Sequence, residues 1–182
     1  MAELLVRTAS DLLVRADTAG RTVFGYAVPF GQVATVNDGR APYKESFQRG
    51  AFARTIEQRG GRIRLHRQHD SGRNLPVGRA VELEERDAGL WAAFAVSRTS
   101  EGDDVLALVE DGVVDSFSIG FRSIRHRPEG DVTVRTEVAL HEVSIVSEPA
   151  YAGAAIVGVR AHGGPQISVA AAYERLALIR RR

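Results

Sequence analysis

Apolar and polar residues alternate along much of the chain, which is the pattern of half-buried β-strands. The alternation predicts two long strands, over residues 115–127 and 131–147, joined by a turn at Pro128-Glu129-Gly130. It also predicts a hairpin around Arg86-Asp87-Ala88-Gly89. The remaining predicted strands are short and cover residues 12–16, 21–28, 43–47, 62–66, 77–84, 90–96 and 155–159.

Helical spacing occurs only in short stretches. Thr99 or Ser100 is in position to cap one helix, and Asp103 stands where the second member of a capping box would be. A linker-like segment, Gly163-Gly164-Pro165, precedes a further predicted helix near the end of the sequence. The helices are expected over residues 52–58, 100–110 and 169–181.

Many short strands with few helices indicate a mostly β fold, either a barrel or a sandwich. The strand–helix–strand rhythm of a parallel α/β domain is missing. The motifs G-x-G-x-x-G after a strand, the P-loop and H-E-x-x-H are also absent from the sequence. Nothing in the pattern therefore indicates a nucleotide-binding domain or a helical zinc hydrolase.

Composition excludes several further classes. The 182 residues include 24 basic and 23 acidic side chains, giving a net charge of +1, and 44% are hydrophobic. These values suit a folded domain, and no apolar run approaches the roughly 18–20 residues of a membrane span. Cysteine is absent, which excludes disulfides, thiol nucleophiles and Cys-ligated zinc. Because no secretory signal opens the sequence, we expect an intracellular protein that does not contact a membrane.

Two windows, Arg54–Arg73 and Val159–Arg182, are locally basic. A nucleic-acid-binding module could use such a window, and its affinity would fall steeply with salt. The near-zero net charge disfavours that function, so we interpret both windows as solvated surface and expect no specific nucleic-acid partner.

Three segments carry polar residues that a β core does not need. One is His66-Arg67-Gln68-His69-Asp70, which directly follows a predicted strand, and another is Ser116–Phe121, where Ser118 stands among apolar residues. The third is Leu140–Val146, where Glu142 and Ser144 lie on the same face of a strand. Each of these features alone is common in proteins without catalytic function.

Together the three segments offer a nucleophile, a base and an acid. Serine attacks well only when a base takes its proton, and histidine is the usual base because it titrates near neutrality. The imidazole needs an acceptor at its other nitrogen. Counted outward from the predicted turn, Ser118 and Glu142 fall about one diagonal pair apart on neighbouring antiparallel strands, and His69 would reach them from a loop.

A metal site is an alternative interpretation of the histidine segment. His66, His69 and Asp70 are close enough in sequence to act as ligands. Residues three apart on a strand face opposite sides, however, and no fourth ligand is evident nearby. We therefore expect neither a metal nor another cofactor.

An ordered series of motifs resembles the tailed-phage prohead (capsid maturation) serine protease family. The resemblance covers about residues 21–160 and is most specific in its last two motifs. The motifs are Gly25-Tyr26-Ala27 with Phe30-Gly31, Tyr43-x-Glu45-x-Phe47-x-x-Gly50-Ala51-Phe52, His69-Asp70 before Pro76-Val77-Gly78, Gly89-Leu90, Ser118-Ile119-Gly120-Phe121, and Leu140-x-Glu142-Val143-Ser144-Ile145-Val146-x-x-Pro149-Ala150.

This resemblance implies a fold like that of the herpesvirus assemblins: a closed or partly closed antiparallel β-barrel surrounded by helices, commonly dimeric. It implies a prohead protease domain over residues 1–161, with residues 162–182 forming a linker and helix of unknown role.

The resemblance also assigns residues. Ser118 would be the nucleophile, rather than Ser116, and His69 the base. Glu142 would orient His69, with His141 as the alternative third member. Amides of Ala150 and Tyr151 would form the oxyanion hole, because Pro149 has no N–H.

The implied activity is that of a serine endopeptidase acting in the host cytoplasm, inside the immature procapsid. Its substrates would be scaffolding protein or the scaffolding segment of the major capsid protein, and the protease itself. A homodimer or higher oligomer is implied. The alternative is a non-catalytic capsid- or scaffold-binding protein that keeps the protease fold.

Overall fold

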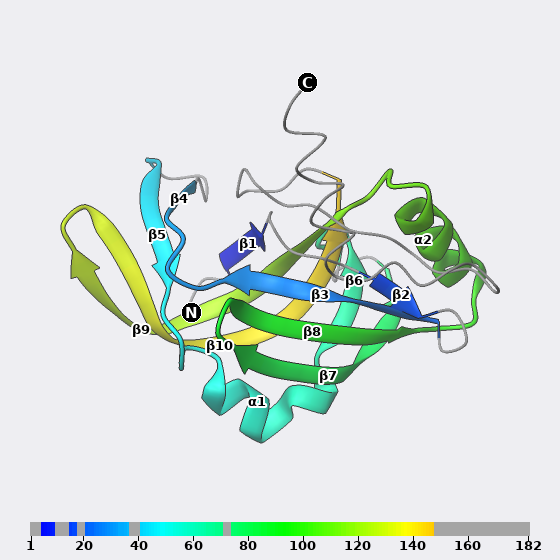
Figure 1. The fold of residues 1–182 in the computed structure, drawn as a ribbon, viewed down its shortest axis with the longest axis horizontal. Coiled ribbons are helices and arrows are strands. Elements are labelled where there is room, and N and C mark those ends of the chain that lie inside the picture. Colours follow the sequence, from blue (N-terminus) through cyan, green and yellow to red (C-terminus); the bar gives the residue numbers. More distant parts are fainter. Residues whose placement is uncertain (1–4, 10–14, 18–20, 37–40, 71–73, 148–182) are drawn as a thin grey trace.

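A computed structural model describes residues 5–9, 15–17, 21–36, 41–70 and 74–147. These residues form one ten-stranded sheet with two short α-helices and a 3-10 turn (Figure 1). None of the helices in these ranges is long and apolar enough to cross a membrane. The elements are β1 (Leu5–Ala9), β2 (Arg15–Asp17), β3 (Thr22–Pro29), β4 (Ala34–Val36), β5 (Tyr43–Phe47), α1 (Ala53–Arg59), η1 (Gly60–Arg62), β6 (Arg64–Arg67), β7 (Gly78–Arg86), β8 (Gly89–Val96), α2 (Ser100–Glu110), β9 (Ser116–Glu129) and β10 (Val132–Val146).

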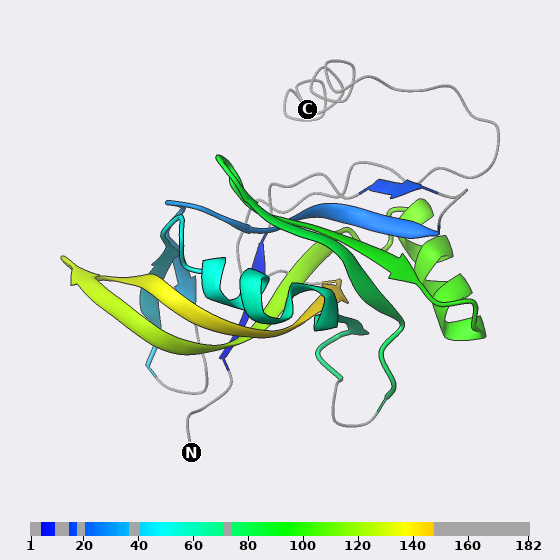
Figure 2. The same ribbon diagram turned by 90° about the horizontal axis from the view of Figure 1, so that it is seen from below.

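The sheet has the order β1-β9-β10-β6-β7-β8-β3-β2, with β5 also paired to β10 and β4 paired to β5. The expectation of an all-antiparallel sheet is wrong at two places, because β5 and β6 both run parallel to β10. β5 pairs with the start of β10 at Val132–Arg135, and β6 pairs with its end at Glu142–Ile145. Helix α1 connects these two strands and lies along β10 (Figure 2), so both strands use one edge of β10 in the same direction.

The sheet curls around one apolar core. Phe94 of β8 and Phe117 of β9 pack with ring centroids 5.8 Å apart, although β7, β6 and β10 lie between their strands in the sheet order. Only a curled sheet brings these two strands face to face. Within the described residues the hydrogen-bonded path runs from β1 to β2 without closing, so the sheet is open. Of the expected closed or partly closed barrel, the closed form is not observed, and the likeness to assemblins remains a prediction.

Most predicted elements are present, and the differences are local. The strand predicted from Arg62 begins two residues later because Gly60–Arg62 forms the 3-10 turn η1. Pro128 belongs to β9, where it pairs with Thr133, so the turn before β10 is tighter than expected. The mostly β class with few short helices is confirmed.

The cap of α2 is Thr99, whose Oγ1 accepts a hydrogen bond from the Gly102 N–H at 3.1 Å. The expected capping box between Ser100 and Asp103 is absent, because Asp103 pairs with Arg21 at 2.6 Å. Gly112 follows the helix with a φ of +69°, the left-handed conformation that a glycine just after a helix commonly adopts.

Several predictions lie outside the described residues. They are residues 12–14 of the strand predicted over 12–16, the strand over 155–159, the linker Gly163-Gly164-Pro165, the helix over 169–181 and the domain boundary at residues 161/162. They remain predictions.

Candidate active site

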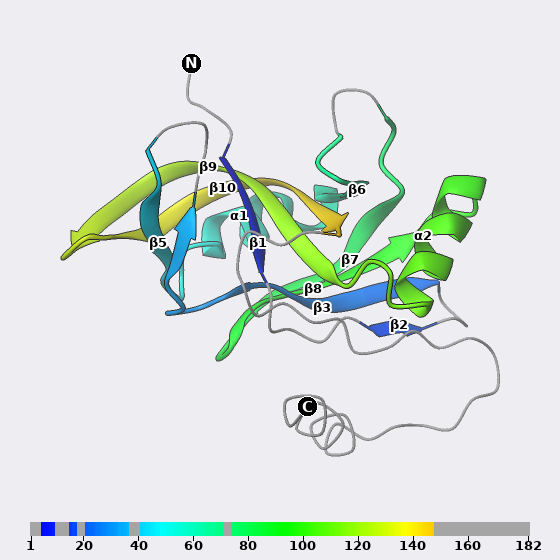
Figure 3. The ribbon, with the colours of Figure 1, turned by 90° about the horizontal axis from the view of Figure 1, so that it is seen from above.

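Strand β9 turns Ser118 away from the apolar core. Its neighbours Phe117 and Ile119 are buried in the core, so the alternation of the strand sends Ser118 to the opposite face. In the backbone register Ser118 is flanked by Ser144 of β10 and by Thr8 of β1, which runs beside β9 (Figure 3).

A β-bulge brings Glu142 to the same face as Ser118. Leu140 and Val143 both belong to the core. They are three positions apart in the sequence, and strict alternation would place them on opposite faces of the strand. The register shifts between Leu140 and Glu142, leaving His141 as the extra residue. The bulge inverts the alternation, so that Glu142 leaves the core side and joins Ser118.

Gly120 leaves the space that the Glu142 carboxylate occupies. The two residues are direct partners across the β9–β10 pair. A Cβ built on residue 120 would lie 2.6 Å from Oε1 and 3.0 Å from Cγ of Glu142. Any larger residue at position 120 would therefore displace this carboxylate.

His69 comes from a tight turn at the end of β6. The Asp70 N–H donates to the Arg67 carbonyl at 2.9 Å, and the two central residues, Gln68 and His69, have φ of +48° and +58°. Two positive φ angles in this position are those of a type I′ turn. For residues other than glycine each costs about 1–2 kcal/mol, so the surrounding structure must hold the turn.

The end of β10 holds this turn. The Gln68 N–H donates to the Ile145 carbonyl at 3.0 Å, and the Gln68 amide donates to Ser147 Oγ at 3.1 Å. The His69 N–H donates to Ser144 Oγ at 3.2 Å. The strand that carries Glu142 thus also fixes the backbone that carries His69.

The imidazole of His69 lies between the two other candidate residues. Its Nε2 is 2.5 Å from Ser118 Oγ, and its Nδ1 is 2.6 Å from Glu142 Oε1. Since a carboxylate only accepts hydrogen bonds, the network assigns the proton to Nδ1 and leaves Nε2 to accept from the Ser118 hydroxyl. Ser118 is fully buried and Glu142 is 5% exposed, whereas the His69 side chain is 21% exposed, so solvent reaches the site on the histidine side.

The rival residues lie elsewhere. Ser116 Oγ donates to Asp115 at 2.8 Å, and no described contact joins it to His69. His141 contacts Arg122 at 3.1 Å through Nε2, while Glu142 takes the position on His69. Burial lowers the pKa of His141, and the nearby guanidinium groups of Arg122 and Arg59 lower it further.

The geometry does not favour the metal alternative. Both ring nitrogens of His69 face protein partners, and Asp70 Oδ2 accepts from the Asn74 amide at 2.5 Å. Within the part of the chain that the structure describes, no three His, Asp or Glu side chains are grouped to hold a metal ion.

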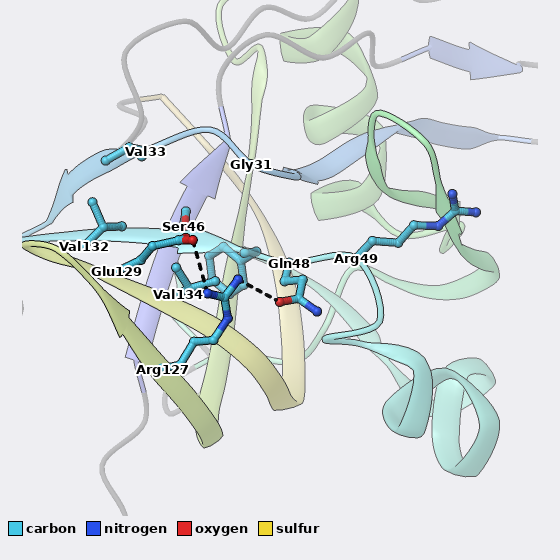
Figure 4. Close-up of a pocket in the computed structure, with 10 residues that line it drawn as sticks. Gly31, Val33, Ser46, Gln48, Arg49, Arg127, Glu129, Val132 and Val134 are labelled. Atoms are coloured by element: carbon cyan, nitrogen blue, oxygen red, sulfur yellow. Dashed lines mark hydrogen bonds and ion pairs between the residues drawn. The ribbon is translucent and has the colours of Figure 1, made fainter.

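A pocket of about 360 Å³ lies between β5 and the distal half of the β9–β10 hairpin. In it Arg127 bonds Gln48 at 3.4 Å and Glu129 at 3.2 Å (Figure 4). Ser118, His69 and Glu142 do not line this pocket, so it is separate from the candidate active site. The proposed oxyanion donors, Ala150 and Tyr151, lie outside the described residues.

Sequence reasoning found the three side chains but missed what positions them. The roles of Gly120 and of the turn at Gln68 were not predicted. Ser144 was noted only as a residue on the Glu142 face. The available signal was the spacing of Leu140 and Val143, which breaks the alternation of the strand where the bulge occurs.

A hydroxyl, an imidazole and a carboxylate in this arrangement are the groups that a serine hydrolase uses. A sequence model described as caudovirus prohead serine protease matches residues 10–164. The chain belongs to this family. The resemblance inferred from the ordered motifs is therefore confirmed.

One sequence relative and one solved structure accompany the family match. The prohead protease of Escherichia phage T5 is 31% identical over 83 residues, which are 44% of this chain and 38% of that protein. The match thus spans well under half the length of this relative. The structure of the capsid assembly protease gp21 of bacteriophage T4 superposes with a TM-score of 0.51 at 10% identity, covering 81% of this chain and 98% of that one, and shows a shared fold.

Proposed function

We propose that this prohead protease family member is a serine endopeptidase in which Ser118 is the nucleophile, His69 the general base and Glu142 the residue that orients His69. One observation carries the proposal: the His69 ring bridges Ser118 Oγ and Glu142 Oε1 through its two nitrogens. A purely structural histidine would not need both partners on a strained turn.

The reaction follows from this arrangement. Ser118 Oγ attacks the carbonyl carbon of the scissile peptide bond while His69 Nε2 takes the hydroxyl proton. Glu142 stabilises the imidazolium that forms, and the same proton then passes to the leaving amine as the C–N bond breaks. Water hydrolyses the resulting ester by the same steps, which returns Ser118 and His69 to their starting states.

The developing oxyanion needs N–H donors. From the family resemblance we propose the amides of Ala150 and Tyr151, which come after β10 in the sequence, since Pro149 has no N–H. Each such donor typically lowers the barrier by about 3 kcal/mol. Because Ser118 has no exposed surface, a substrate reaches it only after the site opens on the side of His69.

The family and the names of its relatives support a place for this activity in virus assembly. We propose that the chain cleaves scaffolding protein or the scaffolding segment of the major capsid protein, and itself, inside the immature procapsid in the host cytoplasm. We also propose that the chain has an assemblin-like fold and that it forms a homodimer or higher oligomer.

The test is cleavage of procapsid proteins of its own virus, followed by gel electrophoresis and mass spectrometry. The wild-type chain is expected to cut them, and Ser118→Ala is expected to leave them intact. Ser116→Ala is the matched control, because it removes a buried hydroxyl two residues away and should cut normally. Cleavage by Ser118→Ala would contradict the assignment, and intact proteins with the wild type would favour a non-catalytic binding protein.

A further inference from the structure

We propose that Ser144 is a positioning residue of the active site, one that holds both Glu142 and His69 through its hydroxyl. The inference rests on the proposed function and adds a residue to it. The side-chain hydrogen bonds of Ser144 join it to His69 and Glu142, so its role is to act through these two neighbours.

The contacts of Ser144 close a ring. Its Oγ donates to Glu142 Oε2 at 2.6 Å and accepts the His69 backbone N–H at 3.2 Å. The other carboxylate oxygen, Oε1, accepts from His69 Nδ1 at 2.6 Å. The path therefore leaves the His69 ring, passes through Glu142 and Ser144, and returns to the His69 backbone.

This ring of hydrogen bonds restrains the Glu142 carboxylate and the His69 backbone, which must both stay in place for the reaction. Oε2 is held by Ser144, so the carboxylate keeps Oε1 against Nδ1 of the imidazole. The bond to the His69 N–H helps to hold a backbone whose φ is +58°. Ser144 is fully buried and Glu142 is 5% exposed, so water does not readily replace the hydroxyl if it is removed.

Strand register explains why residue 144 has this position. Ser144 pairs with Ser118 on one side and with His66 of β6 on the other. Position 144 is therefore next to the nucleophile and next to the strand that leads into the His69 turn. The bulge at His141 places Ser144 on this face, as it does Glu142.

The matched comparison is Ser144→Ala against Ser116→Ala. Both serines are buried, at 0% and 1% exposure, and both lie at the β9–β10 pair, but Ser116 bonds Asp115 instead of the ring. A loss caused only by removing a buried hydroxyl would appear in both variants. A loss of reactivity caused by breaking the hydrogen bonds of Ser144 to Glu142 and His69 would appear in Ser144→Ala alone.

The experiment measures inactivation of the full chain by diisopropyl fluorophosphate, in which Oγ of Ser118 bonds to phosphorus, fluoride leaves and His69 takes the proton. Ser144→Ala is expected to lower kinact about tenfold with KI unchanged, as loss of a hydrogen bond to a charged group predicts. The downfield proton NMR signal of the His69 Nδ1–H is expected to broaden or disappear. Ser116→Ala should keep both values, and thermal unfolding should show that both variants fold.

Equal kinact and an unchanged Nδ1–H signal in Ser144→Ala would overturn the inference while leaving the proposed function intact. Equal losses in the two variants would also overturn it, because the effect would then be structural. Failure of the wild-type chain to react at Ser118 would instead refute the proposed function itself.

Discussion

Gly120 and Glu142 face each other across the β9–β10 pair so closely that the missing side chain of one is the space for the carboxylate of the other. The nearest atoms to a Cβ at position 120 belong to the Glu142 side chain and not to backbone. A larger residue would thus move the carboxylate from His69 without forcing the strands apart.

Gly120→Ala is therefore expected to reduce activity much more than stability. A misplacement of about 1 Å in a catalytic group costs up to about 100-fold in rate. We therefore expect the rate of proteolysis to fall by about 10- to 100-fold. The melting temperature should change little. The control is Gly61→Ala, since a Cβ at position 61 meets no atom within 4 Å. Full activity in Gly120→Ala would show that proteolysis does not require the Glu142 carboxylate at its position beside His69.

The turn that carries His69 gives a second prediction. Gln68→Pro forces φ to about −65° and removes the N–H that bonds Ile145, so the His69 ring should leave the site and activity should be lost. Gln68→Gly keeps the positive φ and the N–H and should remain active. Proteolysis assays on the two folded variants test this. Equal activity would mean that the turn does not position His69.

The sequence predicted the long hairpin and, from it, the central relationship of the site. Counting outward from a turn near Glu129 placed Ser118 and Glu142 about one diagonal apart, with residue 140 opposite Ser118. The structure keeps the diagonal separation, but Ser144 is opposite Ser118 and Glu142 lies two residues before it. The closeness of the two residues follows from the antiparallel hairpin. The exact register differs because the turn lies later, between Glu129 and Val132, and because the bulge at His141 shifts the pairing.

Other features depend on contacts that the sequence does not display. The direction of β5 and β6 relative to β10 follows from the path of the chain through α1, and no local pattern encodes it. The turn at Gln68 and His69 contains neither glycine nor asparagine at its centre, so no propensity signals its positive φ angles. Tertiary bonds from β10 make that turn possible.

A buried ion pair away from the site predicts a large effect on stability. Glu45 is fully buried and Arg135 is 5% exposed, and Nε of Arg135 donates to Glu45 Oε2 at 2.6 Å. Glu45→Gln leaves a buried guanidinium without its counter-charge, which costs about 3–5 kcal/mol. Urea denaturation measures this cost.

The neighbouring surface pair is the control for that measurement. Lys44 and Asp131 are 2.7 Å apart, with side chains 48% and 72% exposed, so Lys44→Gln should change the free energy of unfolding by about 1 kcal/mol or less. Similar losses in both variants would contradict the distinction between buried and exposed pairs.

His141 predicts how stability depends on pH. Burial and the neighbouring arginines lower its pKa below 6.5 in the folded chain, so the unfolded state takes up a proton first as the pH falls. Neutral His141 therefore contributes its full share of the free energy of unfolding above the pKa that it has in the unfolded chain. This share is lost as the pH falls below that pKa. Between about pH 8 and pH 5 the wild type should lose more unfolding free energy than His141→Gln.

The exposed His126 is the control, and His126→Gln should follow the wild type over the same range. If His141→Gln showed the same pH dependence as the wild type, another group would be responsible. Retention of proteolysis by His141→Gln is also expected, because Glu142 and not His141 contacts the His69 ring.

The most direct test of the account is to map the adduct of diisopropyl fluorophosphate by peptide mass spectrometry. We predict one adduct, on Ser118, which His69→Ala abolishes because the hydroxyl then has no base. An adduct on Ser116, or none on the wild-type chain, would contradict the claim that Ser118, His69 and Glu142 form a working catalytic site.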